Sequence, residues 1–330
     1  MTWLERQWQS RTPGAALLYP AAVLFALVAA ARRALYRVGL LKRERLSVPV
    51  IVIGNIMAGG TGKTPLVLWL CEWLRTKGYR PGIVTRGYGG TASTPARARV
   101  DSDPAQFGDE AVLLAARTAC PVWCGRRRAD AARALLAAHP ECSVIVSDDG
   151  LQHYALARDV EIAVVDAARG HGNGWLLPAG PLREPRSRLE KVDALVIHGE
   201  GRLDTHANVR TYRMRLRVET FYNLVHRARR VGANHFRDKA VHAVAGIGSP
   251  ERFFRHLQGL GMRFVEHPYP DHYVYKADDL AYPGADAVVM TEKDAVKCVR
   301  FANERWWALP VDAEVDPALG ALVLRKLESL

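Results

Sequence analysis

Short apolar runs rich in β-branched residues alternate with longer stretches of helical character over much of the chain. Residues 47–54 (SVPVIVIG) have the pattern of a buried parallel strand, and residues 66–74 have helical character. The same alternation recurs through residues 111–165 and residues 241–299. It predicts an α/β fold with mainly parallel sheets. A domain boundary is expected in the polar, arginine-rich stretch of residues 199–213.

The amino terminus has a different pattern. Residues 14–31 contain no charged side chain, and a dense basic group follows at once: Arg32, Arg33, Arg37, Lys42, Arg43 and Arg45. A helix needs about 17 to 25 apolar residues to span a bilayer, so this alanine-rich segment is at the short end. It is compatible with a transmembrane helix, a helix lying in the headgroups, a helix of a soluble core, or a cleaved signal peptide. The basic flank favours an uncleaved anchor, with the rest of the chain on the cytoplasmic side.

Charge and cysteine content narrow the range of partners. The chain of 330 residues carries a formal net charge of +12, so its surface attracts anions. Because neither an RNA-binding signature nor zinc-finger spacing accompanies this charge, we expect an anionic membrane or a phosphorylated ligand rather than nucleic acid. The five cysteines lack paired Cys-x-x-Cys spacing, which predicts buried thiols in a reducing compartment, without a disulfide or a structural metal. Cys120 and Cys124 are expected in the core, on a strand that starts near Pro121.

The most specific motif follows the first predicted strand. A glycine-rich turn between a strand and a helix lets backbone N–H groups converge on phosphate oxygens at the positive end of the helix dipole. Lys63 is expected to contact the β and γ phosphates, and Thr64 to offer its hydroxyl to Mg²⁺. The usual phosphate-loop pattern has glycine where this chain has Met57. A nucleotide site argues against export of the chain, because ATP is cytoplasmic. The predicted nucleotide-binding residues are Met57, Ala58, Gly59, Gly60, Thr61, Gly62, Lys63 and Thr64.

Acidic residues follow another predicted strand. Residues 143–147 (SVIVS) lead directly into Asp148 and Asp149. Two adjacent acids at the carboxyl end of a strand are costly unless a cation neutralises them, so they are candidates for holding the metal of a phosphate loop. The alternative is an ordinary surface turn.

Two further segments could take part in proton transfer. Asp109 and Glu110 precede an apolar stretch, where they are either site residues or the cap and first turn of a helix. His272 lies between Pro270 and Tyr275 and is either a solvent-facing loop residue or a catalytic imidazole. A carboxylate that shares a proton with histidine can take the proton of an acceptor hydroxyl. The sequence does not place Asp109 and His272 side by side.

Two arginines and one glycine turn complete the candidates. Arg128 ends a basic run, and Arg183 ends a Gly/Pro-rich loop at residues 172–185, so each is either a phosphate clamp or a solvated charge. The turn at residues 245–250 is interpreted as a plain strand-to-helix junction rather than a second nucleotide site.

Taken together, these motifs resemble the tetraacyldisaccharide 4′-kinase family, the lipid A 4′-kinases, over almost the whole chain. That family also lacks the first glycine of the usual phosphate loop. The motifs occur in the family's order, after an N-terminal hydrophobic helix, at residues 54–65, 85–89, 108–110, 148–153, 177–184, 246–253, 270–275 and 291–297.

The resemblance implies ATP- and Mg²⁺-dependent transfer of the γ-phosphoryl group to the 4′-hydroxyl of a tetraacyldisaccharide 1-phosphate. The product is lipid IVA, in the lipid A (lipopolysaccharide) biosynthesis of a Gram-negative bacterium. The roles implied for individual residues are Lys63 and Thr64 for nucleotide and metal, Asp109 as the base with His272 as its partner, Glu110, Asp148 and Asp149 around Mg²⁺, and Arg128 and Arg183 as phosphate contacts.

The resemblance also implies an architecture and a location. It implies a membrane helix with its basic flank at residues 1–45, a P-loop NTPase-like kinase domain at residues 46–205, and a smaller C-terminal α/β lobe at residues 206–330 that completes the site. The chain would sit at the bacterial inner membrane with its catalytic body facing the cytoplasm, and no obligate protein partner is expected. Two other classes remain. A membrane-associated switch ATPase would carry lysine where this chain has Ala58, and a nucleic-acid-dependent ATPase would account for the basic charge.

Overall fold

The larger of two sheets is organised around the strand that precedes the glycine-rich turn. The structure is a computed structural model that describes residues 3–92, 94–199, 201 and 209–330. β1 pairs in parallel with β5 on one side and β6 on the other. The strand order across this sheet is β15 (Asp312–Val315), β8 (Thr211–Arg217), β7 (Ala194–His198), β6 (Val160–Asp166), β1 (Val50–Gly54), β5 (Val144–Asp148), β2 (Pro81–Thr85), β4 (Val122–Cys124) and β3 (Ala96–Ala98).

Both faces of this sheet are covered, as a parallel sheet requires. Ile51 and Ile53 of β1 face a core cluster that includes α4 and α10, whereas Val50 and Val52 face a second cluster that includes α7. This period-two alternation explains why β1 reads as an uninterrupted apolar run. The helices of this lobe are α4 (Lys63–Thr76), α5 (Pro104–Phe107), α6 (Asp109–Arg117), α7 (Arg128–Ala138), the 3-10 helix η1 (Arg186–Lys191) and α10 (Pro317–Glu328).

A second α/β lobe contains the smaller sheet. Four of its strands, β11 to β14, run parallel, and β9 and β10 extend the edge beyond β14 in antiparallel fashion. The strand order is β10 (Arg230–Gly232), β9 (Thr220–Asn223), β14 (Trp306–Leu309), β13 (Ala287–Thr291), β11 (Val241–Ala245) and β12 (Val265–Pro268). Its helices are η2 (Ala233–Phe236), α8 (Pro250–Gly259), η3 (Ala277–Leu280), α9 (Glu292–Cys298) and η4 (Val299–Phe301).

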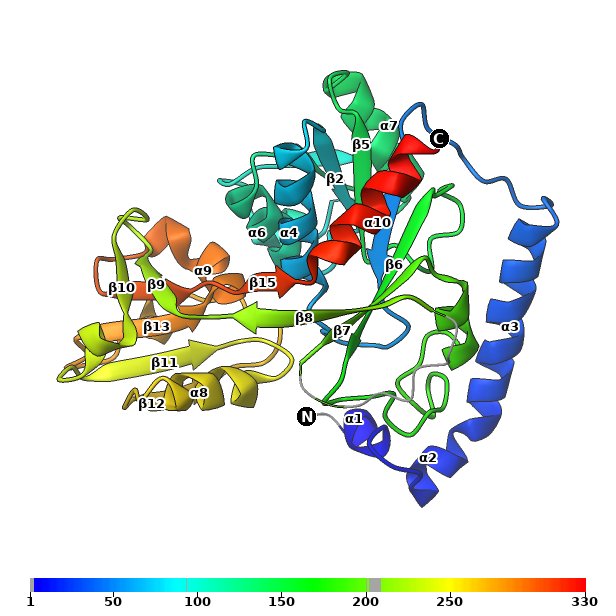
Figure 1. Cartoon of the computed structure of the whole chain (residues 1–330). Helices are drawn as coiled ribbons and strands as arrows, with labels where there is room; N and C mark the ends of the chain where they lie inside the picture. Colours follow the sequence, from blue (N-terminus) through cyan, green and yellow to red (C-terminus); the bar gives the residue numbers. More distant parts are fainter. Residues whose placement is uncertain (1–2, 93, 200, 202–208) are drawn as a thin grey trace.

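The chain divides between the lobes differently from the predicted boundary. That boundary, between residues 205 and 206, lies outside the described residues, but β8, β15 and α10 all follow it and still belong to the first lobe. β8 alternates buried and exposed positions, and its Tyr212 and Met214 are buried in the core of the first lobe. Leu319, Leu322 and Val323 of α10 join the same core. The second lobe therefore comprises the chain between β8 and β15, which join the two lobes in Figure 1.

The N-terminal segment contains α1 (Trp3–Gln7), α2 (Pro13–Leu17) and α3 (Tyr19–Arg37). α3 extends along one flank of the larger lobe (Figure 1), and Ala22 is its one buried residue. Leu24, Leu27 and Val28 are each at least 60% exposed. By length and composition, α3 is the one helix within the described residues that could cross a membrane. A helix with an open apolar surface of this kind is typical of membrane association rather than of a soluble core.

The five cysteines lie in the interior as free thiols. Cys124 is on β4, a strand that begins at Val122, next to the predicted Pro121. Burial raises the pKa of the Cys124 thiol to about 12. These side chains therefore pack as small apolar groups, as predicted from their spacing.

Candidate functional site

The glycine-rich turn connects β1 to α4 and leaves backbone donors open. β1 ends at Gly54, and α4 begins at Lys63 after Gly62, which has a left-handed φ of 82°. The side-chain amide of Asn55 donates to the Gly59 carbonyl at 3.3 Å and to the Thr61 hydroxyl at 3.0 Å, which fixes the curvature of the loop. Within the described residues, no acceptor engages the backbone N–H groups of residues 60–62. Open amides at a helix N-terminus form a site for an anion.

The first half of the loop is held by the rest of the lobe. Met57 is buried in the second core cluster, and the Ala58 N–H donates to the Pro181 carbonyl at 2.8 Å. Arg169 donates to the carbonyls of Gly60 at 3.0 Å and Ala58 at 3.4 Å. The methionine in place of glycine is thus an anchor in the core, and the open amides begin after it. Arg169 was not among the predicted residues, because nothing in its local sequence links it to the loop.

Asp149 connects the loop lysine to a second cation. Lys63 Nζ lies 3.4 Å from Asp149 Oδ1, and Arg183 Nη1 lies 2.9 Å from Asp149 Oδ2. Burial alone would raise the pKa of this carboxyl, but the Lys63 and Arg183 charges outweigh it and lower the pKa to about 2. Asp149 is therefore ionised at physiological pH and holds both cations beside the phosphate loop.

Asp148 is in the opposite electrostatic situation. It ends β5 with 1% of its surface exposed, and neither carboxylate oxygen has a hydrogen-bond partner within the described residues. Burial raises its pKa to about 7, and the negative charges of Glu110 and Asp149 add to the effect. A buried carboxyl without a partner is expensive unless it binds a cation or keeps its proton.

The donors present suit Mg²⁺. Thr64, in the first turn of α4, offers a hydroxyl, and Asp148 offers carboxylate oxygens; these are the hard oxygen ligands that Mg²⁺ prefers. In the part of the chain that the structure describes, no three His, Cys, Asp or Glu side chains are grouped closely enough to hold a metal by themselves. This fits Mg²⁺, which is commonly held by one or two carboxylates together with substrate phosphates.

Arg128 holds the turn that carries Asp148 and Asp149, called the acidic turn below. It begins α7 and is 2% exposed, and it donates to the Asp149 carbonyl at 3.2 Å. Its Nη1 lies 2.9 Å from His153 Nε2. Burial lowers the pKa of Arg128 to about 10, although Asp149 and Asp148 oppose the shift. The guanidinium is still charged at neutral pH and is used to hold the Asp149 turn, so its predicted contact with phosphate stays a prediction.

His153→Gln is expected to make the free energy of unfolding less dependent on pH in the acid range. Burial and the Arg128 charge lower the pKa of His153 to about 3, whereas an unfolded chain protonates at about 6.5. Between these values the unfolded state binds the extra proton, so stability is lost as pH falls through this window. Without the imidazole, the slope of the unfolding free energy against pH should fall by up to about 1.4 kcal/mol per pH unit.

Urea unfolding at several pH values between about 4 and 6 measures this slope. The exposed histidine variant His226→Gln is the control. An unchanged slope in His153→Gln would show that the buried imidazole is not linked to acid stability.

The predicted proton-transfer pair meets across the two lobes. His272 Nδ1 lies 3.0 Å from Asp109 Oδ2, although 163 positions separate them in the chain. Asp109 is the first residue of α6, and Gly108 before it has φ 83°, with the Tyr88 carbonyl so close that a Cβ at this position would clash with it. Glycine is required there, and it turns the buried Asp109 carboxylate towards the second lobe.

Backbone strain marks the same residues. Among the described residues, the non-glycine positions with positive φ are Asp149, at 46°, and His272, at 60°. Such conformations are uncommon outside glycine and are concentrated at functional sites, where the surroundings enforce them.

The structure also decides between the two interpretations of Asp109 and His272. The N-cap of α6 is Gly108, not Asp109. His272 is held against Asp109 rather than free in a solvent-facing loop.

Two lysines that were not predicted as site residues lie beside this pair. Both are on α9, four positions apart, and so on one face of the helix. Lys293 Nζ is 3.3 Å from Asp271 Oδ1 and 3.9 Å from Glu110 Oε1. Lys297 Nζ is 3.9 Å from Asp109 Oδ2. Their spacing after an apolar strand is the sequence pattern that could have identified them. Lys293 brings positive charge from the second lobe to the acids of α6, whereas Lys297 is paired more closely with Asp294 of its own helix, at 2.7 Å.

A further ion pair joins the lobes at the end of β6. Arg252 of α8 lies 2.5 Å from the Asp166 carboxylate, which is 1% exposed. β6 is the parallel neighbour of β1, so Asp166 ends its strand beside the phosphate loop. The turn at residues 245–250, which leads from β11 into α8, is the strand-to-helix junction that was expected. The carboxyl ends of the parallel strands in both sheets thus supply the charged residues that meet between the lobes.

Comparison with known proteins places this arrangement in a family. The model of the family described as tetraacyldisaccharide-1-P 4′-kinase (LpxK) matches residues 14–328. Proteins named tetraacyldisaccharide 4′-kinase from Methylobacillus flagellatus and Azoarcus sp. are 50% and 52% identical over 328 and 322 residues. These alignments cover 99% and 97% of this chain, and 96% and 94% of the relatives.

A solved structure has the same fold. LpxK from Aquifex aeolicus, described as an "apo" form in complex with ATP, superposes with a TM-score of 0.82 at 28% sequence identity. The match covers 95% of this chain and 99% of that one. A family model over nearly the whole chain and relatives of about 50% identity agree with the site geometry. The chain belongs to the tetraacyldisaccharide-1-P 4′-kinase family.

Proposed function

We propose that this protein uses ATP to phosphorylate the 4′-hydroxyl of a tetraacyldisaccharide 1-phosphate, forming lipid IVA in lipid A biosynthesis. One observation carries the proposal: the chain combines a phosphate loop with open amides and Lys63 with a carboxylate–imidazole pair contributed by both lobes. The two are near each other, since the charge of Glu110, next to Asp109, helps to raise the pKa of Asp148. The loop suits the phosphates of a nucleotide. The pair suits the deprotonation of an acceptor hydroxyl. The named relatives agree with this activity.

The residues of the chain divide the work of the transfer. Asp109 accepts the proton of the 4′-hydroxyl as the oxygen bonds to the γ-phosphorus, and the bond between that phosphorus and the bridging oxygen breaks to release ADP. His272 orients the Asp109 carboxylate through its Nδ1 contact. Lys63 stabilises the charge that spreads over the transferred phosphoryl oxygens. The amides of residues 60–62 hold the phosphates in place.

Mg²⁺ is proposed to be held by Thr64 and Asp148, with Glu110 and Asp149 contributing negative charge nearby. When bound, it neutralises charge on the phosphates. Asp148 is the better candidate for direct contact because its oxygens have no partner within the described chain, whereas Lys63 and Arg183 already occupy Asp149. Arg183 is the better placed of the two predicted arginines for contact with phosphate, since it shares the Asp149 carboxylate with Lys63.

We further propose that α3 anchors the enzyme at the inner membrane, with the catalytic lobes facing the cytoplasm. The exposed apolar face of α3 and the basic residues that end it support this location. It brings the enzyme to a substrate whose acyl chains keep it in the bilayer. The transfer site lies between the lobes, where closure excludes water.

The direct test of the activity is a mass spectrum of the lipid after incubation with enzyme, ATP, Mg²⁺ and detergent-dispersed acceptor. One added phosphoryl group per disaccharide, produced together with one ADP, is the expected result. A switch ATPase would instead hydrolyse ATP without acceptor and leave the lipid mass unchanged, and that outcome would refute the kinase assignment.

Replacing Leu24, Leu27 and Val28 together by Gln is expected to release the enzyme from vesicles, because it removes the exposed apolar face of α3. These positions avoid the contacts of the N-terminal segment with the body, where Trp8 Nε1 donates to the Pro178 carbonyl at 2.9 Å. Vesicle sedimentation measures the effect, and turnover of detergent-dispersed acceptor should persist.

The matched control replaces three exposed valines of the body, Val100, Val265 and Val274, by Gln. This control should sediment like the unmodified protein. Equal sedimentation of the α3 variant and the unmodified protein would argue against α3 as the anchor.

A further inference from the structure

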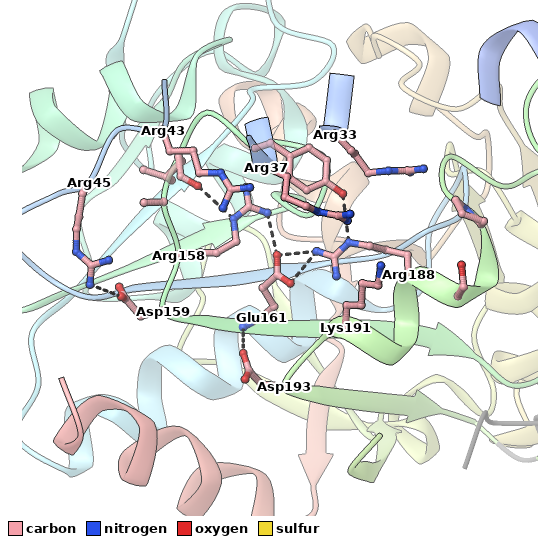
Figure 2. A pocket seen from close by; sticks show the side chains of 15 residues that line it. Arg33, Arg37, Arg43, Arg45, Arg158, Asp159, Glu161, Arg188, Lys191 and Asp193 are labelled. Atoms are coloured by element: carbon pink, nitrogen blue, oxygen red, sulfur yellow. Dashed lines mark hydrogen bonds and ion pairs between the residues drawn. The ribbon is translucent and has the colours of Figure 1, made fainter. Parts of the chain in front are cut away.

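A strongly basic cavity of about 660 Å³ lies where the end of α3 meets the larger lobe, as Figure 2 shows. Its described lining residues include none from the phosphate loop or the acidic turn, so it is separate from the proposed transfer site. Three acids line it, namely Asp159, Glu161 and Asp193. The basic lining residues are Arg33, Arg37, Arg43, Arg45, Arg158, Arg188 and Lys191.

The acids do not neutralise this charge. Asp159 pairs with Arg45 at 2.9 Å. Asp193 pairs with Lys326, which lies outside the lining, at 2.8 Å. Glu161 is shared between two arginines of the lining, Arg158 and Arg188, so one negative charge faces two positive charges. Net positive charge therefore remains on the walls of the cavity.

The back wall is a fixed structure rather than a set of mobile surface side chains. Arg188 Nη2 lies 2.6 Å from Glu161 Oε1, and Arg158 Nη1 lies 3.0 Å from the same oxygen. The side chains of Arg188 and Arg158 are 8% and 11% exposed. Tyr154 adds a hydroxyl contact to Arg188 at 3.2 Å and places its ring beside both guanidinium groups. Figure 2 shows both arginines directed at Glu161.

Three basic side chains complete the cavity without a carboxylate partner in the described chain: Arg37, Arg43 and Lys191. All three are exposed to solvent. Preorganised arginines with further cations in front of them suit an anion with several oxygens, and phosphate is the anion that such a cluster fits best.

The position of the cavity identifies where such a phosphate would come from. Arg33 and Arg37 line the cavity and belong to the last turns of α3, the helix whose Leu24, Leu27 and Val28 are exposed. If the apolar face of α3 is buried among acyl chains, as proposed above, the cavity lies at the depth of the headgroups. A phospholipid phosphate is then available at high local concentration.

We infer that this cavity binds the phosphate of an anionic phospholipid headgroup. The inference rests on the proposed membrane location of α3. The bound headgroup adds a second point of attachment beside the helix. With α3 as its one attachment to the membrane, the protein could rotate about the axis of this helix. A second attachment at the headgroup prevents that rotation and fixes the orientation of the catalytic lobes.

The test uses the full chain with Arg37, Arg43 and Lys191 all replaced by Ala, and vesicles of phosphatidylcholine with or without phosphatidylglycerol. Binding to the phosphatidylglycerol vesicles should weaken by a factor on the order of a thousand. Three basic side chains near an anionic surface account for about a hundredfold of this loss, at about fivefold each, and the lost direct contacts with one bound phosphate account for about tenfold more. Binding to pure phosphatidylcholine vesicles, turnover of acceptor in neutral detergent and thermal unfolding should not change.

A matched control separates a built site from diffuse attraction. Arg6, Arg32 and Lys42 are exposed basic residues of the same N-terminal region that do not line the cavity, so replacing them by Ala removes the same charge. The cavity variant should lose at least about tenfold more affinity than this control. Equal losses would mean diffuse electrostatic attraction and would overturn the inference.

Two other outcomes would also overturn it. A raised KM in neutral detergent, where no anionic lipid is present, would mean that the cavity holds the phosphate of the acceptor itself. The cavity would be a site for soluble phosphate if inorganic phosphate raised the thermal stability of the unmodified protein but not of the cavity variant, while both proteins bound vesicles equally. Formation of product with one added phosphoryl group, and so two in all, by the unmodified enzyme in detergent tests the kinase assignment separately, so the two failures are distinguishable.

Discussion

Lys63→Ala is expected to lower kcat by a factor on the order of 10² to 10³ and to leave the fold intact. The lysine stabilises charge that develops on the transferred phosphoryl group, and its ammonium is paired with Asp149 at 3.4 Å. Its ion-pair partner Asp149 keeps Arg183 as a second cation at 2.9 Å, so no unpaired acid is left behind. Steady-state turnover of detergent-dispersed acceptor, with thermal unfolding measured in parallel, gives the result.

Lys77→Ala is the control for this change. Lys77 caps the opposite end of the same helix, α4, and is exposed, so its loss should leave kcat unaltered. Near-normal turnover by folded Lys63→Ala protein would remove the phosphate loop from the mechanism. A large loss in both variants would point instead to damage of α4.

The second large effect is expected at the pair formed by Asp109 and His272. Asp109→Ala and His272→Ala should each lower kcat by about 10² to 10⁴, the range in which general base catalysis contributes, while ATP affinity changes little. Because the two side chains act as one unit at 3.0 Å, the double variant should cost little more than the worse single variant. A double-mutant cycle on kcat, with ATP binding and thermal unfolding for each protein, measures this.

His226→Ala, an exposed histidine of the second lobe, controls for the loss of an imidazole as such. Losses at Asp109 and His272 that multiply in full would mean that the residues act independently. Reduced thermal stability with normal turnover per folded molecule would make the contact a link between the lobes rather than a base and its partner.

Local features of the site could be predicted from sequence because they depend on neighbouring residues. The β1 strand, the glycine turn and α4 follow one another directly, so the periodicity and the glycines determine their geometry. Asp148 ends, and Asp149 directly follows, a strand whose other residues are mostly apolar. The fold class was confirmed, since parallel strands with helices between them leave a repeating pattern and the solved relative superposes over most of the chain.

Features that depend on distant pairing could not be predicted in this way. The Asp109–His272 and Asp166–Arg252 contacts join residues far apart in sequence, and no spacing rule relates them. The sequence left Arg128 as either a phosphate clamp or a solvated charge and did not predict its burial, but α7 carries it into the interior. Local periodicity does not reveal such burial, because it depends on which sheet face the helix covers.

The domain boundary was misplaced for the same reason. β8 alternates charged and apolar residues and β15 is only four residues long, so neither carries a sequence pattern that assigns it to one sheet. Their membership of the larger sheet follows from pairing between segments almost a hundred residues apart along the chain.

That pairing has a mechanical consequence for the enzyme. Arg217 at the end of β8 lies directly opposite Asp312 at the start of β15, so the second lobe is an insertion into what would otherwise be a β-hairpin. Both of its covalent attachments leave from one point of the first lobe, as two hydrogen-bonded strands rather than a single flexible chain. Such a ribbon bends easily out of its plane and resists sliding along its length, so His272 should approach and leave Asp109 along an arc about this double attachment.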